Sequence, residues 1–386
     1  MAANRPPRIA IVAGEPSGDL LGSHLIAALR ARCPGAEFYG IAGPKMIFAG
    51  ARTLFSMEKL SVNGYVEVIR HLPELLAIRR KLKQAILADP PDLFIGIDAP
   101  DFNFSLEIAL KARGIPTIHY VSPSIWAWRG ERIKKIARAV SQMLVVFPFE
   151  EAIYRKAGIP VTYVGHPLAD LLPEQPDRLA VRKRLGMATD ARIIALLPGS
   201  RVSELNQHAQ LFIETAQLLE ARHPGIRFVT PLVNRETREI FTKALHEYPR
   251  PPSIQIMIGH ADYAMIAADL ILVASGTATL EAALLQRPMV ITYRVPKLTA
   301  WLMRKRAYLP WVGLPNILAN RGLVPELLQE RATPEKLAEA LDNLLTDSNL
   351  CREMEIEFAR QYRSLKQNTA ARMAVAVMPY LEGKCG

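Results

Sequence analysis

The chain has 386 residues and a formal net charge of +11, and half of its residues are apolar. This length exceeds what one hydrophobic core usually serves, so we expect two domains. The sequence contains no low-complexity segment and no fixed repeat, which excludes disordered and repeat architectures. No uninterrupted apolar run approaches the length of a membrane-spanning helix, and the first run, residues 9–13, is too short for a signal peptide.

The spacing of the cysteines and the clusters of basic residues limit which sites and ligands the protein is expected to have. The three cysteines are Cys33, Cys351 and Cys385. They lie far apart and form no CxxC pair, so we expect neither a disulfide framework nor a zinc site, as fits a reducing cytosol. Basic residues cluster at 79–83, 129–138 and 303–308, beside apolar or aromatic residues. Since no nucleic-acid motif accompanies them, an anionic lipid surface or a phosphorylated substrate is favoured over nucleic acid; ordinary solvated helix faces are the alternative.

Short β-rich runs alternate with helical patterns through the first half of the chain. Strands are expected at 9–14, 92–98, 117–122, 143–149 and 161–165, with helices at 20–32, 104–113, 130–139 and 150–157. This alternation predicts a parallel sheet with helices on both faces. Residues 165–177 contain three prolines and are expected to form a linker.

The turn after the first expected strand has the sequence GEPSGD, residues 14–19. Turns of this kind often bind phosphate, because free N–H groups and the helix dipole favour an anion. Glu15 and Asp19, however, place two carboxylates in this turn. A phosphate ligand is therefore a poor fit, and the sequence pattern alone leaves the ligand open.

Residues 66–83 combine an apolar cluster with four basic side chains, and Pro73 is expected to interrupt any single helix. One interpretation is a core-facing helix; the other is a patch that dips into a membrane and is backed by the basic residues. The apolar cluster consists of Val66, Val68, Ile69, Leu72, Leu75 and Leu76.

Two carboxylates follow the expected strand 92–98. Asp98 ends the strand, and Asp101 is expected in the next loop. A carboxylate at the carboxyl edge of a parallel sheet can take a proton from an attacking hydroxyl group. An ordinary turn or helix-capping role is the alternative for either residue.

A second alternation follows the linker, with strands expected at 192–201, 226–233, 254–259, 269–276 and 288–295. The intervening helices are expected at 204–222, 236–246 and 277–286, followed by a late helix at 334–346. Two doubly wound α/β domains in tandem are therefore predicted, and we expect the active site between them.

Two strand-to-helix turns of the second domain have the residue types that bind a nucleoside diphosphate. In LLPGSRVSELNQH, residues 196–208, Gly199 allows close approach, while Ser200 and Arg201 can bind phosphate oxygens. The alternative is an N-capping serine beside an exposed arginine. In VASGTATLEAALL, residues 273–285, the SGT turn precedes a helix that carries Glu281.

Glu281 can accept hydrogen bonds from both hydroxyl groups of a ribose. The alternative is a carboxylate that is simply stabilised by the helix dipole near the N-terminus of its helix. The chain contains neither G-x-G-x-x-G after the first strand nor a P-loop motif, which weighs against a dehydrogenase and a P-loop NTPase. A sugar nucleotide remains as the ligand class. A glycosyltransferase, a sugar-nucleotide epimerase and a non-catalytic sugar-nucleotide-binding protein are all compatible with it.

Seven motifs in order resemble those of the lipid-A-disaccharide synthases over nearly the full length: GEPSGD, SPSIWAWR, FPFE, GHPLAD, LLPGSR, ASGTATLEAAL and LPNILANRGLVPELLQE. This resemblance implies a GT-B fold with two Rossmann-like, doubly wound domains facing across a cleft. Residues 1–168 would form the acceptor domain, and residues 169–349 the UDP-sugar donor domain. A C-terminal helix of about 350–386 would pack back onto the first domain, and homodimers that exchange this region are implied.

The resemblance also assigns roles to the matched residues. Asp98 becomes the expected general base, and Arg201 opposes the departing UDP. Donor-binding positions are Gly199, Ser200, Arg201, Gln207, Ser275, Gly276, Thr277, Glu281 and Asn316. The GEPSGD turn then belongs to the acceptor side through Glu15, Ser17 and Gly18, while Asp19 caps its helix.

The implied reaction joins UDP-2,3-diacylglucosamine to 2,3-diacylglucosamine 1-phosphate, with inversion, to give a β-1,6-linked disaccharide and UDP. No cofactor and no metal is expected, because Arg201 and two helix N-termini can supply the positive field at the leaving diphosphate. Members of this family are peripheral proteins on the cytoplasmic face of the inner membrane of Gram-negative bacteria. A basic and partly apolar exterior suits acylated, anionic substrates.

Overall fold

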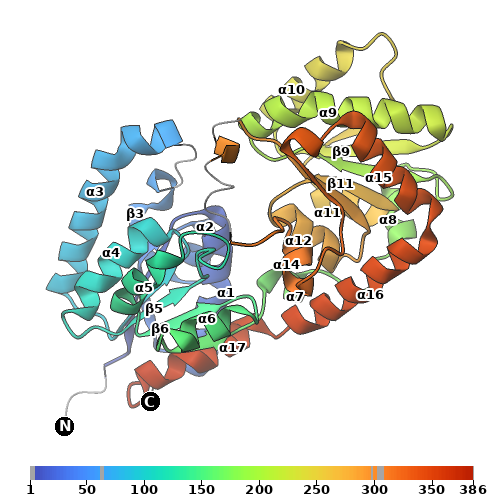
Figure 1. The fold of residues 1–386 in the computed structure, drawn as a ribbon. Helices are drawn as coiled ribbons and strands as arrows, with labels where there is room; N and C mark the ends of the chain where they lie inside the picture. Colours follow the sequence, from blue (N-terminus) through green and yellow to red (C-terminus); the bar gives the residue numbers. More distant parts are fainter. Residues whose placement is uncertain (1–4, 61–64, 297–298, 302–307, 386) are drawn as a thin grey trace. The chain divides into compact units, whose positions relative to one another are not determined.

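A computed structural model describes residues 5–60, 65–296, 299–301 and 308–385, without the side chains of residues 65–71 (Figure 1). The contacts within the chain define two compact units. Unit 1 comprises Met1–Asp170 and Leu365–Gly386, and unit 2 comprises Leu171–Ser364. The segment that returns to unit 1 thus begins at Leu365, and not at about residue 350 as the resemblance implied.

Unit 1 contains a seven-stranded parallel sheet in the order β3-β2-β1-β4-β5-β6-β7. The strands are β1 (Arg8–Ala13), β2 (Glu37–Ala42), β3 (Ala51–Ser56), β4 (Leu93–Ile97), β5 (Thr117–Tyr120), β6 (Gln142–Val145) and β7 (Val161–Tyr163). β1 and β4 are almost entirely apolar and buried, as strands covered on both faces must be. The strand order reverses between them, so this is the topological switch point where doubly wound sheets bind ligands.

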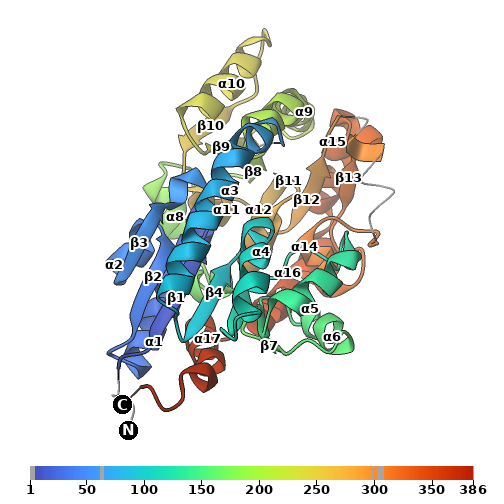
Figure 2. The same cartoon turned by 90° about the vertical axis from the view of Figure 1, so that its left-hand side faces the viewer.

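Helices cover both faces of this sheet. In Figures 1 and 2, α3 (Tyr65–Ala88), α4 (Pro100–Lys111) and α5 (Ile133–Ala139) pack together on one face. The other face carries α1 (Pro16–Arg32), α2 (Pro44–Phe48) and α17 (Thr369–Val377). The shorter α6 (Glu150–Lys156) also belongs to unit 1, and α7 (Pro167–Leu171) lies at its boundary with unit 2.

Unit 2 contains a six-stranded parallel sheet in the order β10-β9-β8-β11-β12-β13. The strands are β8 (Ile193–Leu197), β9 (Arg227–Leu232), β10 (Ile254–Ile258), β11 (Leu270–Ala274), β12 (Met289–Tyr293) and β13 (Glu326–Leu328). The order reverses between β8 and β11, which makes a second switch point. Most of the buried apolar side chains of unit 2 form one core around these strands.

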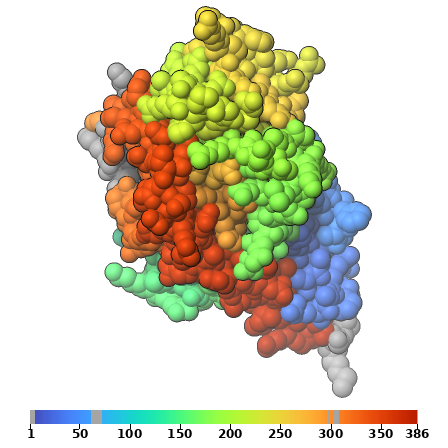
Figure 3. Space-filling view, turned by 90° about the vertical axis from the view of Figure 1, so that its right-hand side faces the viewer, coloured from blue at the N-terminus to red at the C-terminus, as the bar shows by residue number. Residues whose placement is uncertain are grey.

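The helices of unit 2 also form two layers. α9 (Val202–Arg222) packs against α10 (Arg235–His246) and α15 (Pro334–Thr346), and Figure 3 shows α15 alongside α9 on the surface. The other layer contains α8 (Arg178–Arg184), α11 (Ala261–Ala267), α12 (Thr277–Leu284) and α14 (Leu314–Ala319). α16 (Ser348–Leu365) leads to the segment that returns to unit 1.

Several local expectations from the sequence were wrong. α3 continues through Pro73, because a proline removes one helical hydrogen bond and can bend a helix without ending it. α4 begins at Pro100, a good first helical residue, so Asp101 lies in its first turn and not in a loop. β2, β3 and α2 were not anticipated: Gly40 interrupts β2 (EFYGIA), and both β3 (ARTLFS) and α2 (PKMIF) are short and mix polar with apolar residues.

The expectation of no disulfide was also wrong, because Cys33 and Cys385 are bonded to each other. They are 352 residues apart in sequence, and the return of the C-terminal segment to unit 1 brings them together. Sequence spacing cannot reveal such a pair. Cys351 is a free, half-buried thiol.

Candidate active site

The switch point of unit 1 brings the GEPSGD turn beside the turn that carries Asp98. Ala13 of β1 pairs with Ile97 of β4, so the turns that follow the two strands start side by side. A Cβ atom on Gly14 would lie only 2.7 Å from the Cβ of Ala99. Glycine at position 14 thus allows the two turns to touch.

Asp98 is half-buried and lies in the left-handed backbone region, which is uncommon for residues other than glycine. Its φ angle is +50°, and that of Ala99 is +44°. Its backbone N–H donates to the carbonyl of Tyr120, and its carboxylate Oδ1 accepts from the N–H of Ala99 at 2.8 Å. Asp101 instead forms an ion pair with Arg132 at 3.0 Å on the surface of α4.

The residues of GEPSGD have distinct environments. Glu15 and Ser17 are exposed, while Gly18 is buried against Ala13 and Ile97. Asp19 is buried and accepts hydrogen bonds from the N–H groups of Lys45 and Met46, each at 2.9 Å. Asp19 therefore caps α2, and the prediction that it caps its own helix was wrong.

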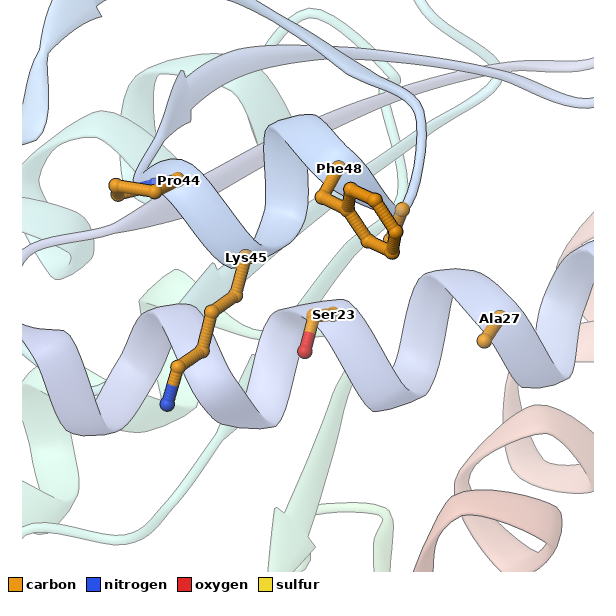
Figure 4. A pocket seen from close by; sticks show the side chains of 6 residues that line it. Ser23, Ala27, Pro44, Lys45 and Phe48 are labelled. Carbon is orange, nitrogen blue, oxygen red and sulfur yellow. The ribbon is translucent and has the colours of Figure 1, made fainter.

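A cavity of about 470 Å³ lies between α1 and α2 (Figure 4). It is lined by Ser23, Ala27, Pro44, Lys45, Phe48 and Ala49. None of the predicted site residues lines it. The carboxyl edge of the sheet therefore remains the better candidate for chemistry in unit 1.

Unit 1 contains a buried cluster of aromatic and acidic residues that the sequence analysis did not predict. Its residues come from the motifs SPSIWAWR, FPFE and GHPLAD. Glu150 accepts from the indole N–H of Trp126 at 3.2 Å and from the N–H of Phe147 at 3.0 Å. Burial raises the pKa of Glu150 to about 7. The ring of His166 lies 5.4 Å from that of Phe147, and burial lowers the pKa of this histidine to about 4.

In unit 2, the turn after β8 is closed by a carboxylate of the protein itself. Glu204 accepts from the N–H groups of Ser200 and Arg201 at 2.9 and 3.2 Å, from Arg201 Nη1 at 3.1 Å and from the hydroxyl of Tyr293 at 3.2 Å. Gly199 has a φ angle of +128°, and a Cβ atom there would lie 2.5 Å from the Cβ of Glu204. The glycine thus makes room for Glu204. The Arg201 side chain stays 66% exposed.

His208 is a second residue behind this turn that the sequence did not single out. Its Nδ1 lies 2.8 Å from the carbonyl of Pro198, and its Nε2 accepts from the N–H of Arg294 at 2.9 Å. Donation by Nδ1 and acceptance by Nε2 require the neutral ring, and burial lowers the pKa of His208 accordingly. The histidine fixes the end of β8 to the end of β12.

The helix that follows β11 begins without a side-chain cap. Gly276 is the N-cap residue of α12, and within the described part of the chain the N–H groups of Gly276, Thr277 and Ala278 donate no hydrogen bond. Gly276 and Thr277 are exposed, and Ser275 is half-buried. This helix start leaves N–H groups open to an anion, in contrast to the turn after β8.

Glu281 lies one turn further along α12 and is partly buried. Burial, together with the nearby Asp262, raises the pKa of Glu281 to about 6. Its carboxyl group therefore titrates just below neutral pH. The side chain is positioned on the same short helix as the open N–H groups.

The other two predicted donor-side residues differ in exposure. Gln207 is exposed on α9. Asn316 is fully buried; its Nδ2 donates to the carbonyl of Val324 and to Glu326, and its Oδ1 accepts from the N–H groups of Leu323 and Val324. Asn316 therefore orders the segment around α14, and its amide is not exposed to a ligand.

The predicted membrane patch is only partly visible, since the side chains of Val66, Val68 and Ile69 lie outside the described residues. Leu72 is 46% exposed and Leu76 is 44% exposed, while Leu75 is half-buried. Leu72 and Leu76 therefore do not belong to a packed core. Among the described residues, no helix is long and apolar enough to cross a membrane. The basic cluster at 303–308 lies almost wholly outside the described residues.

Within the described ranges, no group of three or more His, Cys, Asp and Glu side chains is arranged to bind a metal ion.

Comparisons with known proteins add independent information on the whole chain. A family model described as lipid-A-disaccharide synthetase matches residues 9–378. The chain is 59% identical over 379 residues to "Lipid-A-disaccharide synthase" of Aromatoleum aromaticum, which covers 97% of this chain and 96% of the relative. It is 57% identical to the protein of the same name from Methylobacillus flagellatus, over 97% of this chain and 100% of the relative.

Similar solved structures share the fold at low sequence identity. The glycosyltransferase of kitacinnamycin has a TM-score of 0.65 at 17% identity, covering 97% of this chain and 99% of that one. The calicheamicin glycosyltransferase CalG4 has a TM-score of 0.63 at 18% identity, with coverage of 98% and 99%. A UDP-GlcNAc 2-epimerase from Neisseria meningitidis reaches 0.62 at 12% identity, with coverage of 97% and 99%. The predicted GT-B fold, with two parallel-sheet α/β domains, is confirmed.

Proposed function

Because the chain belongs to the lipid-A-disaccharide synthetase family, we propose that its two switch points perform the sugar transfer of lipid A biosynthesis. The donor would be UDP-2,3-diacylglucosamine, and the acceptor 2,3-diacylglucosamine 1-phosphate. The products would be UDP and a β-1,6-linked tetraacyl disaccharide 1-phosphate. The observation that carries this proposal is the chain-wide family match, with the family's motifs at the carboxyl edges of both sheets.

In unit 1, Asp98 would deprotonate the 6-hydroxyl group of the acceptor, which then attacks the anomeric carbon of the donor from the side opposite UDP. One bond forms between this oxygen and the anomeric carbon as the bond to UDP breaks, so the configuration inverts. The ion pair of Asp101 with Arg132 supports Asp98 as the base. Exposed Glu15 and Ser17, on the adjacent turn, would bind sugar hydroxyl groups.

In unit 2, the open N–H groups of Gly276 and Thr277 and the side chain of Arg201 would bind the diphosphate of UDP. Negative charge grows on this group as it departs, so the same contacts would stabilise the transition state. Glu281 would accept hydrogen bonds from the ribose hydroxyl groups. The turn after β8 would contribute through side chains, because Glu204 already binds its N–H groups.

We further propose that the protein works at an anionic membrane surface and contacts it through Leu72 and Leu76 of α3. Their exposure and the neighbouring basic residues 79–83 support this role. Both proposed substrates are acylated, so a protein surface that touches the bilayer would shorten their path from the membrane to the active site.

The proposed roles are tested by Asp98→Asn and Arg201→Ala. Loss of the base should lower kcat by a factor of about 100 to 10,000 with little change in the KM of either substrate. Loss of the arginine should lower kcat/KM for the donor, since the phosphate loses a charged partner. Wild-type turnover with unchanged KM values in both variants would contradict the assignment.

An epimerase is a second candidate because a UDP-GlcNAc 2-epimerase shares the fold. Epimerisation requires acids or bases on both sides of the sugar and no acceptor. The family match favours transfer over this alternative.

A further inference from the structure

The turn between β4 and α4 holds two consecutive residues in a conformation that residues other than glycine rarely adopt. Asp98 and Ala99 both have positive φ angles, of +50° and +44°. Such backbone persists only where its surroundings hold it in place, and it clusters at functional sites. The contacts that fix this turn therefore determine where the Asp98 carboxylate lies.

The side chain of Asn103 is one of those contacts. Its Nδ2 donates to the backbone carbonyl of Asp98 at 2.8 Å and reaches that of Ile97 at 3.5 Å. The backbone N–H of Asn103 also donates to the carbonyl of Ala99 at 3.0 Å. One residue of α4 thus binds three successive carbonyl groups through the strained turn.

Asn103 is itself held in a closely packed, buried setting. Its side chain has no exposed surface, and a Cβ atom on Gly96 would lie 3.1 Å from both its Cβ and its Cγ. One helical turn later, Glu107 Oε1 lies 2.7 Å from Nδ1 of His119, and both side chains are fully buried. Gly96 and His119 are paired across β4 and β5. Glycine at 96 therefore allows α4 to bring Asn103 and Glu107 down onto the sheet.

We infer that Asn103 is a positioning residue for the transfer reaction, which acts by holding the carbonyl of Asp98 so that the carboxylate stays at the sheet edge beside GEPSGD. This inference rests on the proposed role of Asp98 as the base. Asn103 itself touches no substrate, because it is buried behind the turn.

The first variant is Asn103→Leu, which keeps the number and branching of the side-chain heavy atoms, replaces the amide with bulkier methyl groups and removes the side-chain N–H donors. We expect kcat to fall about 10- to 100-fold, because a misplaced base is less effective, while the KM of each substrate changes less than about twofold. Asn103→Ser, a smaller change in the same position, should give a fall in the same direction. The serine variant also tests the inference if the leucine variant folds poorly.

A double variant of Asp98 and Asn103 distinguishes a positioning role of Asn103 from a general loss of structure. In the Asp98→Asn background, assayed at high enzyme concentration, Asn103→Leu should cause no further decrease in kcat. The matched control is Leu110→Ala, since Leu110 is also fully buried on α4. This control should lower the melting temperature by creating a cavity, while leaving kcat close to that of the wild type.

Three results would count against the inference, and they differ from one another. Wild-type kcat in both Asn103 variants, with Asp98→Asn inactive, would overturn the role of Asn103 and leave the proposed function intact. An additive loss in the double variant would show that Asn103 acts independently of Asp98. Wild-type kcat in Asp98→Asn would remove the proposed base and the positioning role with it.

Discussion

At the residue scale, Glu204 changes the interpretation of the turn that carries Arg201. A glycine, a serine and an arginine after a strand predict a phosphate-binding backbone. The N–H groups of Ser200 and Arg201 are instead bound by Glu204, and Gly199 provides the space for that carboxylate. The open N–H groups at the start of α12 are therefore the stronger candidate for the diphosphate, with Arg201 contributing its side chain.

Glu281 gives a prediction for the dependence of donor binding on pH. Burial raises its pKa to about 6, so the carboxyl group is mainly ionised above pH 6 and mainly protonated below it. Only the ionised group accepts hydrogen bonds fully from two ribose hydroxyl groups. The KM for the donor should therefore rise as the pH falls from 8 to 5, and steady-state kinetics at each pH would measure this.

Glu281→Gln is the matching variant, because glutamine keeps the size of the side chain and cannot ionise. Its donor KM should be about tenfold higher than that of the wild type at pH 8 and should change little down to pH 5. A wild-type pH profile in this variant would mean that a group other than Glu281 causes the pH dependence of the donor KM.

At the element scale, the return of the C-terminal segment defines the composition of unit 1. The carboxylate of Asp170 accepts from the N–H groups of Asn368 and Thr369 at 3.0 and 2.6 Å, which anchors the start of α17. The disulfide between Cys33 and Cys385 then ties the far end of the segment to the end of α1. Both contacts join residues that are distant in sequence but belong to the same unit.

The disulfide also tests whether the segment is exchanged between two chains. We expect peptide mapping of air-oxidised protein to find Cys33 linked to Cys385, with the mobility of a monomer on a non-reducing denaturing gel. A linked dimer that disappears with reductant would instead indicate exchanged segments. Cys351→Ser should change neither result, and free thiols at both Cys33 and Cys385 would contradict the pairing.

At the scale of the whole molecule, the sequence predicts the strands next to the candidate site well. It predicts poorly the contacts between distant segments that support them. β1, β4, β8 and β11 are apolar runs that end in glycine- or aspartate-containing turns, so their position at the switch points follows from periodicity and topology. Asp19 capping α2 and the pairing of Cys33 with Cys385 depend on contacts between distant segments. No local pattern encodes such contacts.

Membrane association is a prediction for the whole protein because its net charge is +11 and Leu72 and Leu76 are exposed. Leu72→Asp combined with Leu76→Asp should weaken binding to vesicles that contain phosphatidylglycerol by about tenfold, without lowering the melting temperature. Val375→Asp is the control, since Val375 is 60% exposed on α17. Strong destabilisation by the leucine changes, or equal loss in the control, would contradict the proposed surface.

The most direct measurement incubates the purified protein with UDP-2,3-diacylglucosamine, first alone and then with 2,3-diacylglucosamine 1-phosphate, and identifies the products by mass spectrometry and NMR. We expect the donor to remain unchanged alone. With the acceptor present, we expect UDP and a β-1,6-linked disaccharide 1-phosphate in equal amounts. An epimerised sugar in the absence of the acceptor, or an unchanged donor in its presence, would contradict the account.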